Sequence, residues 1–405
     1  MIKRIKSLGA SGILVALAQV FLIVVIAQFR GLQEIGEYSY ILAICVPLNV
    51  LGLFGFKQLL ASEVNVASAF DNVLKMRFIF HSALFLTFLV VATYLITKFS
   101  VNVSIPLLVA LCLFKFIESH HELELGKYQN QNLTHAIDKL NAFKFSVYVL
   151  ISLLVMLSDL ELSLLFAFGS LILFIHYFSV LRPLQLCNSE TQHKVLGRYV
   201  FKRSSHLVFI ALFTAVLANL PKYYLMTFST IEQLAFFTIF FQAMSFVNML
   251  VINLVNYQWG KIKISVAQNL TPTISHLGNA DIKKLVLLIS AVSLAVICFS
   301  FVSIQLVSFV FNINAQSYFF EWLIINVAFA LNFYSHLLNA LNIMLKREKI
   351  LARTTILILG IGLLACLFLP NGQAFFSASL LLLIIFALKG VFGAYILLLG
   401  GRSDK

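Results

Sequence analysis

Apolar segments long enough to cross a lipid bilayer recur along the whole chain, and they limit its fold more than any other feature. A transmembrane helix needs about 20 mostly apolar residues, and twelve such segments succeed one another over the 405 residues. Since the bilayer core offers no water to unpaired backbone groups, such segments span it as helices. We therefore expect an all-α polytopic membrane protein. The expected spans are 8–29, 38–60, 76–97, 104–118, 140–158, 162–180, 205–228, 234–256, 284–309, 319–344, 352–369 and 374–399.

Positive charge predicts the orientation of these spans. All but four of the 29 lysines and arginines fall on one side of the membrane when successive spans alternate in direction. The exceptions are Arg30 and Lys98 on the other side, and Lys222 and Lys389 within spans. Cytoplasmic loops collect lysine and arginine, so we expect both termini in the cytoplasm. The loops on the other side are too short to form a domain.

Composition and motifs argue against several other classes of protein. The chain is 61% hydrophobic and 11% charged, whereas an ordinary soluble domain is about 45–50% apolar. Its net charge of +13 is spread over short loops, and a nucleic-acid surface would concentrate that charge on one face. The five cysteines have no paired spacing, which predicts neither a disulfide framework nor a zinc site.

Catalysis finds no support in the sequence. The phosphate-binding pattern G-x-x-x-x-G-K-[ST] is absent, so ATP hydrolysis by this chain is not indicated. The five aspartates lie far apart, and no loop is large enough for the paired carboxylates of a metal-dependent glycosyltransferase. One group resembles a metal cluster, but we interpret it as part of a solvated loop: His120, His121, Glu122 and Glu124. We expect a transporter that has no catalytic residues, cofactor or metal.

Two lysines inside spans are the first candidates for a binding site. Lys222 follows Pro221 in the span 205–228, and an ammonium at the centre of a spanning helix costs about 2.5–3.5 kcal/mol on insertion scales. It either reaches the membrane surface or faces a water-filled cavity that receives an anion. Lys389 lies near the middle of the last span, where Gly390 and Gly393 allow another helix to approach. No acidic residue is expected deep in any span to pair with it.

Polar stripes follow two spans of the second half. At 100° per residue, each set covers one face of its helix, and we expect both faces to point into the bundle. Interhelical hydrogen bonds and contacts to sugar hydroxyls are the two open interpretations. The stripes are Gln242, Ser245, Asn248, Asn253 and Asn256 in the eighth span, and Asn332, His336, Asn339 and Asn342 in the tenth.

Three further positions are weaker candidates. Lys57 and Lys115 lie near cytoplasmic helix ends, where a lysine reaches the membrane surface or meets an anionic headgroup. His336 has a side chain that titrates near neutral pH, which would suit proton coupling, but we favour a neutral, hydrogen-bonded ring.

A faint repeat divides the chain into an N-lobe at 1–200 and a C-lobe at 201–405. Residues 33–40, after the first span, parallel residues 232–239, after the seventh. Both segments lead into an even-numbered span, as expected of parallel six-helix repeats.

Several motifs give the chain a resemblance to a known family. They are Gly31 to Tyr40 followed by LGLFGFKQ at 51–58, KFIES at 115–119 running into LGKYQ at 125–129, and LPKYY at 220–224. The chain resembles the bacterial polysaccharide flippases of the Wzx (O-antigen flippase) type, within the multidrug/oligosaccharidyl-lipid/polysaccharide exporter superfamily. Ala235 departs from the glycine that is usual there, and the segment after Phe311 matches less well.

The resemblance implies two six-helix lobes around a central cavity in the bacterial cytoplasmic (inner) membrane. It further implies translocation of an undecaprenyl-diphosphate-linked oligosaccharide, with Lys222 and Lys389 as the residues that receive the diphosphate. A polysaccharide polymerase and a chain-length regulator are the partner proteins that such a role suggests. Two alternatives stay open. A drug or metabolite exporter of the same superfamily would prefer acidic residues in its helices, and a membrane polysaccharide polymerase would need a large periplasmic loop.

Overall fold

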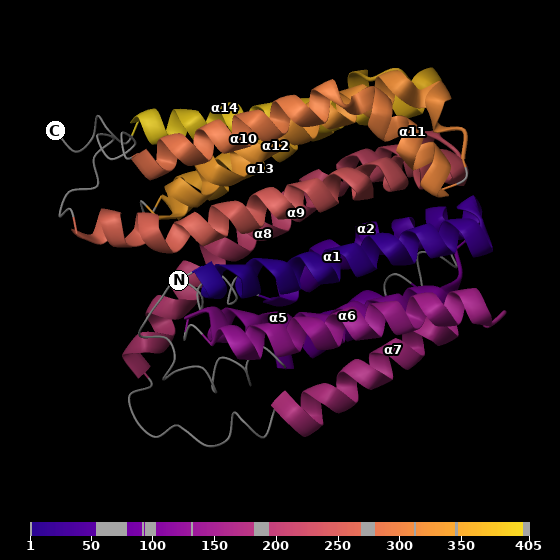
Figure 1. Cartoon of the computed structure of the whole chain (residues 1–405), viewed down its shortest axis with the longest axis horizontal. Helices are drawn as coiled ribbons and strands as arrows, with labels where there is room; N and C mark the ends of the chain where they lie inside the picture. The colour runs from indigo at the N-terminus through magenta and orange to yellow at the C-terminus, as the bar shows by residue number, and fades with distance from the viewer. Residues whose placement is uncertain are drawn as a thin grey trace. The chain divides into compact units, whose positions relative to one another are not determined.

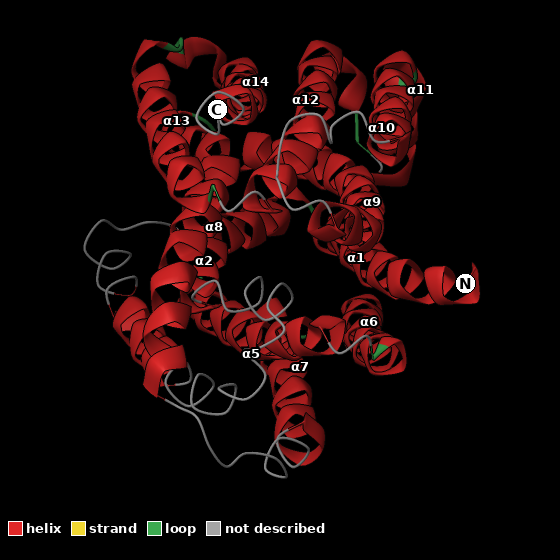
Figure 2. Cartoon of the chain, turned by 90° about the vertical axis from the view of Figure 1, so that its left-hand side faces the viewer, coloured by secondary structure: helices red, strands yellow, loops and turns green. Residues whose placement is uncertain are grey.

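The computed structural model shows a chain built from helices. It describes residues 2–53, 79–90, 93, 103–130, 133–181, 194–268, 280–311, 313–344 and 347–399. Every regular element in these ranges is helical (Figures 1 and 2). In chain order, the first elements are α1 (Ile2–Arg30), α2 (Leu32–Leu53), the helix Ile79–Val90, α5 (Ile105–Asn130), α6 (Thr134–Leu157), α7 (Leu162–His176) and the π-helical turn η2 (Tyr177–Leu181).

The later elements complete this order. They are α8 (Lys194–Phe228), α9 (Ile231–Gln268), α10 (Ala280–Cys298), α11 (Ser300–Phe311), η4 (Ala315–Tyr318), α12 (Phe319–Met344), α13 (Glu348–Phe368), η5 (Asn371–Gln373) and α14 (Ala374–Leu399). Within the described ranges, nine helices are long and apolar enough to cross a membrane, or ten if the bent pair α10 and α11 forms one span. The predicted class, an all-α polytopic membrane protein, is confirmed. The expected span 76–97 lies largely outside the described residues.

The ninth expected span is broken rather than continuous. We predicted one helix over 284–309, but α10 and α11 meet at an angle of 66°. The Ser300 hydroxyl donates to the Val296 carbonyl at 3.1 Å, the kind of back-bonding that often bends helices. From α12, the Trp322 indole N–H donates to the Ser300 carbonyl at 3.0 Å, and the Asn326 amide donates to the Ser300 hydroxyl at 2.8 Å. The two contacts from α12 depend on a neighbouring helix, so the local sequence did not predict the bend.

The chain divides into two compact units, Met1–Ala215 and Val216–Lys405. In the first, α5 packs against α2 and α7; in the second, α12 packs against α9 and α14. Both α5 and α12 are 26 residues long. The assignment of six helices each to lobes at 1–200 and 201–405 stays a prediction.

The faint sequence repeat coincides with matching helix starts. α2 begins at Leu32 and α9 at Ile231, just before the paired segments 33–40 and 232–239. Burial follows the same pattern: Ile35 and Tyr38 are buried in α2, and Leu234 and Phe237 are buried in α9. The two units therefore use corresponding helix faces in their own cores.

Gly393 allows close packing of α14 against α12, whereas Gly390 does not. A Cβ atom at Gly393 would lie 3.1 Å from the Leu338 Cβ, but a Cβ at Gly390 would meet no atom of the described residues within 4 Å. The prediction that both glycines permit close approach is therefore wrong for Gly390. The Asn342 amide also donates to the Gly393 carbonyl at 3.0 Å, which ties the two helices together at this level.

We expect Gly393→Val to destabilise the protein by about 1–3 kcal/mol, because the side chain would overpack the contact between two helices. Gly390→Val is the matched control, since it makes the same chemical change three residues away in open space. Thermal unfolding of both variants in detergent measures the difference. Equal shifts in the two melting temperatures would contradict this account of the α12–α14 contact.

Two cysteines form a disulfide that their spacing did not predict. Cys45 on α2 and Cys112 on α5 are bonded, with their Cα atoms 5.8 Å apart. The prediction of no disulfide is wrong for this pair, because the packing of α2 against α5 brings together positions 67 residues apart in sequence. Cys298 and Cys366 carry free thiols.

Candidate functional site

Lys222 is a buried cation with an aromatic neighbour. It lies on α8 directly after Pro221, which cannot donate a backbone hydrogen bond to the turn before it. The side chain is 7% exposed, and its Nζ lies 5.1 Å from the centroid of the Phe241 ring on α9. Among the described residues, no carboxylate lies within ion-pairing distance of it. A cation–π contact offsets part of the desolvation of an ammonium but does not neutralise its charge.

Lys389 is a second buried cation, on α14. It is also 7% exposed, and its Nζ lies 5.3 Å from the centroid of the Phe386 ring. The ammonium donates to the Asn332 Oδ1 on α12 at 3.3 Å. In the described part of the second unit, its polar partner is thus a neutral amide, and no acidic group pairs with it.

The Asn332 amide organises the groups around Lys389. Its Oδ1 accepts from Lys389 and from the Ser335 hydroxyl at 3.0 Å. Its Nδ2 donates to the Asn248 Oδ1 at 3.4 Å and lies 3.1 Å from the His336 Nε2. An amide has two donor hydrogens and two acceptor sites, so these four contacts use its full capacity and fix its orientation. Because Nδ2 can only donate, the His336 Nε2 must accept, as in a neutral imidazole.

A row of phenylalanine rings links the surroundings of the two lysines. The Phe241 and Phe329 centroids lie 5.2 Å apart, and those of Phe329 and Phe386 lie 5.5 Å apart. Both pairs are T-shaped, an arrangement that aromatic rings favour. The outer rings of the row are the ones that contact Lys222 and Lys389. These rings keep the surroundings apolar, which strengthens any interaction of the ammonium groups with an anion.

The structure unites part of the predicted site. Lys389, Asn248, Asn332 and His336 form one hydrogen-bonded cluster within the second unit. Asn339 lies farther along α12, is partly buried and has no hydrogen-bond partner among the described residues. Asn253 lies on α9 with an undescribed side chain, and Lys57 lies outside the described residues.

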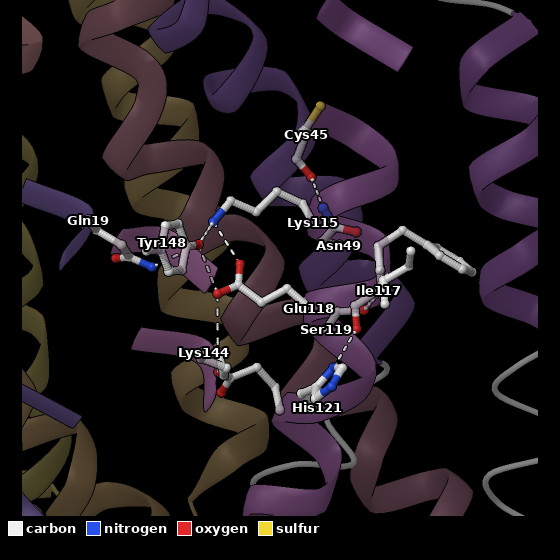
Figure 3. Close-up of polar contacts among 12 residues, drawn as sticks. Gln19, Cys45, Asn49, Lys115, Ile117, Glu118, Ser119, His121, Lys144 and Tyr148 are labelled. Carbon is white, nitrogen blue, oxygen red and sulfur yellow. Dashed lines mark hydrogen bonds and ion pairs between the residues drawn. The ribbon is translucent and has the colours of Figure 1, made fainter. Parts of the chain in front are cut away.

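Lys115 belongs to a different, charge-compensated cluster in the first unit (Figure 3). Its Nζ lies 2.7 Å from a Glu118 carboxylate oxygen and donates to the Tyr148 hydroxyl at 2.9 Å. Tyr148 in turn donates to Glu118 at 2.9 Å, and the Gln19 amide donates to the Tyr148 oxygen at 3.1 Å. Lys144 lies 3.5 Å from Glu118 and also pairs with Glu122. This network of α1, α5 and α6 engages Lys115 inside the unit, where we had expected it to face the membrane surface.

The segment after Glu118 is buried helix, and its interpretation as a solvated loop was wrong. α5 continues to Asn130, and the side chains of His120, His121 and Glu124 are buried. The His121 Nδ1 lies 3.1 Å from the Ile117 carbonyl, and its Nε2 lies 3.3 Å from the His176 Nδ1. No cluster of metal-ligating side chains occurs in the ranges that the structure describes. Packing against α7 accounts for the burial of this polar segment.

Corresponding helices of the two units differ in charge. We count each helix from its first residue. Position 14 is then Glu118 in α5 and Asn332 in α12, and position 18 is Glu122 in α5 and His336 in α12. The first unit therefore places carboxylates beside its lysines, and the second places an amide and an imidazole beside Lys389. The sequence did not predict this contrast, because the expected span 104–118 ended at Glu118, whereas α5 continues to Asn130 and is as long as α12.

Comparison with known proteins shows the fold. No family model and no curated protein matches the sequence. The chain is similar to a multidrug resistance MATE family transporter of the MOP superfamily in its inward-facing conformation, with 12% identity over 97% of this chain and 94% of that one and a TM-score of 0.65. An outward-facing MATE family transporter matches with 12% identity, coverage of 99% and 98%, and a TM-score of 0.59.

A third structure has the same fold. It is a MOP superfamily transporter from Pyrococcus furiosus, with 14% identity over 99% of this chain and 95% of that one and a TM-score of 0.59. The binding pocket of that protein is reported to have reversed polarity, which suggests a different function for it. At these identities the similarity shows the shared fold of MATE transporters.

Proposed function

We propose that this protein is a flippase that moves an undecaprenyl-diphosphate-linked oligosaccharide, such as an O-antigen repeat unit, across the cytoplasmic membrane by alternating access. One observation carries the proposal: Lys222 and Lys389 are buried, and no described carboxylate pairs with either. An uncompensated buried charge is costly, and a protein keeps one where it has a role. A diphosphate brings the missing negative charge in the cargo itself.

The surrounding polar groups suit the rest of such a cargo. Asn248, Asn332 and His336 offer donors and acceptors next to Lys389, which is the chemistry that sugar hydroxyls need. The same fold occurs in inward-facing and outward-facing transporters, which supports alternating access. A polysaccharide polymerase and a chain-length regulator are the partner proteins that this role suggests.

A drug exporter is the second candidate, because multidrug resistance transporters share the fold. The charge of the site argues against a cationic drug, since two ammonium groups would repel it. The Pyrococcus furiosus transporter illustrates that a change of pocket polarity accompanies a suggested change of function within this fold.

Proteoliposomes distinguish the two candidates. The purified protein is reconstituted with a fluorescent undecaprenyl-diphosphate-linked oligosaccharide, and a membrane-impermeant quencher reports how much of it changes leaflet. We expect faster exchange than in protein-free vesicles, and no transport of a cationic dye under the same ion gradients. Dye transport without glycolipid exchange would reject the flippase in favour of the exporter.

A further inference from the structure

Counted from the first residue of each helix, Asn332 stands at the same place in α12 as a carboxylate does in α5. Glu118 and Asn332 are the fourteenth residues of α5 and α12, and both side chains are buried. Glu118 lies 2.7 Å from the Lys115 ammonium, and the Asn332 Oδ1 lies 3.3 Å from the Lys389 ammonium. Each lysine thus has an oxygen acceptor from the corresponding position, but only the acceptor in the first unit is negatively charged.

We propose that Asn332 determines the charge selectivity of the Lys389 site: its neutral amide orients the ammonium and leaves the positive charge free for a phosphate group of the cargo. The proposal rests on the proposed function, because it assumes that the cargo's phosphate binds at Lys389. Asn332 is a specificity-determining residue in this account, and a carboxylate at the same position would compete with the cargo as an internal anion.

The hydrogen bonds of Asn332 explain how a neutral group holds this position. Contacts with Asn248 and His336 fix its Nδ2, and therefore its Oδ1 faces Lys389 and Ser335. A neutral acceptor binds an ammonium more weakly than a charged one, since charge-assisted hydrogen bonds are about twice as strong. An arriving phosphate oxygen can therefore replace the amide oxygen at Lys389, while the amide keeps its other contacts.

Asn332→Asp tests the proposal with little change in side-chain shape. The new carboxylate would keep the contacts to Lys389 and Ser335 and would add a negative charge. His336 can adapt, because its other tautomer carries a hydrogen on Nε2 and donates to the carboxylate. Asn248 can rotate its amide to donate as well. Asn332→Ser is the neutral control, since it also removes the Nδ2 donors that contact Asn248 and His336 but adds no charge.

Binding of farnesyl diphosphate to the purified full-length protein in detergent is the measurement, with farnesol as the uncharged control ligand. We expect N332D to weaken diphosphate binding by about tenfold to a hundredfold, the range of one charge-assisted interaction. We expect N332S to stay within about threefold of wild type, because the site charge is unchanged. Farnesol binding should be the same in all variants. If N332D does not fold, N332E introduces the same charge and can be measured in its place.

Lys389→Ala separates this proposal from the proposed function. If K389A binds the diphosphate as wild type does, then Lys389 is not its binding site. The charge-selectivity proposal then fails, and so does the role of Lys389 in the proposed function. If K389A loses binding and N332D retains it, the charge-selectivity proposal is overturned and the role of Lys389 stands. Equal loss in N332D and N332S would also overturn it, because geometry and not charge would then explain the effect.

Discussion

Glu118→Ala should lower the free energy of unfolding by about 3–5 kcal/mol, the usual cost of removing one partner from a buried ion pair. The carboxylate lies 2.7 Å from the Lys115 ammonium and 3.5 Å from that of Lys144. It also accepts the Tyr148 hydroxyl hydrogen at 2.9 Å. Its removal leaves Lys115 without its counter-charge and the Tyr148 hydroxyl without its acceptor, and burial prevents water from replacing it.

Thermal and chemical unfolding of the purified protein measure this loss. Asp159→Ala is the matched control, because it removes one negative charge from an exposed position between α6 and α7, where we expect little change. The double variant Glu118→Ala/Lys115→Ala should recover part of the stability, since it also removes the unpaired ammonium. A destabilisation by Glu118→Ala that matches that of Asp159→Ala would show that the network does not stabilise the unit.

The helices were predictable because they follow from local composition. A run of apolar residues long enough to span a bilayer can satisfy its backbone only as a helix, whatever packs against it. The positions of Lys222 and Lys389 within such runs marked them as candidates but left open whether Lys222 reaches the membrane surface; in the structure both side chains are buried. The stripe containing Asn332 and His336 follows helical periodicity alone, and these two side chains do lie together.

What the sequence did not predict depends on pairs of helices. The bend at Ser300 relies on contacts from Trp322 and Asn326, and the disulfide relies on the packing of α2 against α5. Glu118 marked the end of an expected span, and the polar residues after it resembled a solvated loop. Lys144, which lies 22 residues after Glu122 in the chain, joins them inside the unit. Single-segment reasoning cannot detect a counter-charge that arrives from another helix.

These observations give opposite expectations for the two groups of lysines. Lys115 and Lys144 have carboxylate partners, so their charges contribute to a network that stabilises the unit. Lys222 and Lys389 have aromatic and amide neighbours, so their charges remain uncompensated in the described structure. A lysine retained for its cargo should therefore reduce stability, whereas a lysine retained for folding should increase it.

Replacing Lys222 or Lys389 with methionine should lower translocation of the diphosphate-linked glycan by about tenfold to a hundredfold. Each change removes one charge-assisted interaction with the cargo, which is typically about 1.5–3 kcal/mol. The same variants should unfold at an equal or higher temperature than wild type, because a buried unpaired ammonium is replaced by an apolar chain of similar length. Glycolipid exchange in proteoliposomes and thermal unfolding in detergent measure the two effects on one preparation.

Lys284→Met is the matched control, since this lysine is exposed on α10 of the same unit and should affect neither quantity. Loss of translocation together with a fall in melting temperature would mean that Lys222 and Lys389 hold the fold. Unchanged translocation in both variants would place the route of the cargo elsewhere. A loss of activity with stability maintained or increased distinguishes a cargo-binding cation from a structural one, because only the former is compensated by a charge that enters from outside the chain.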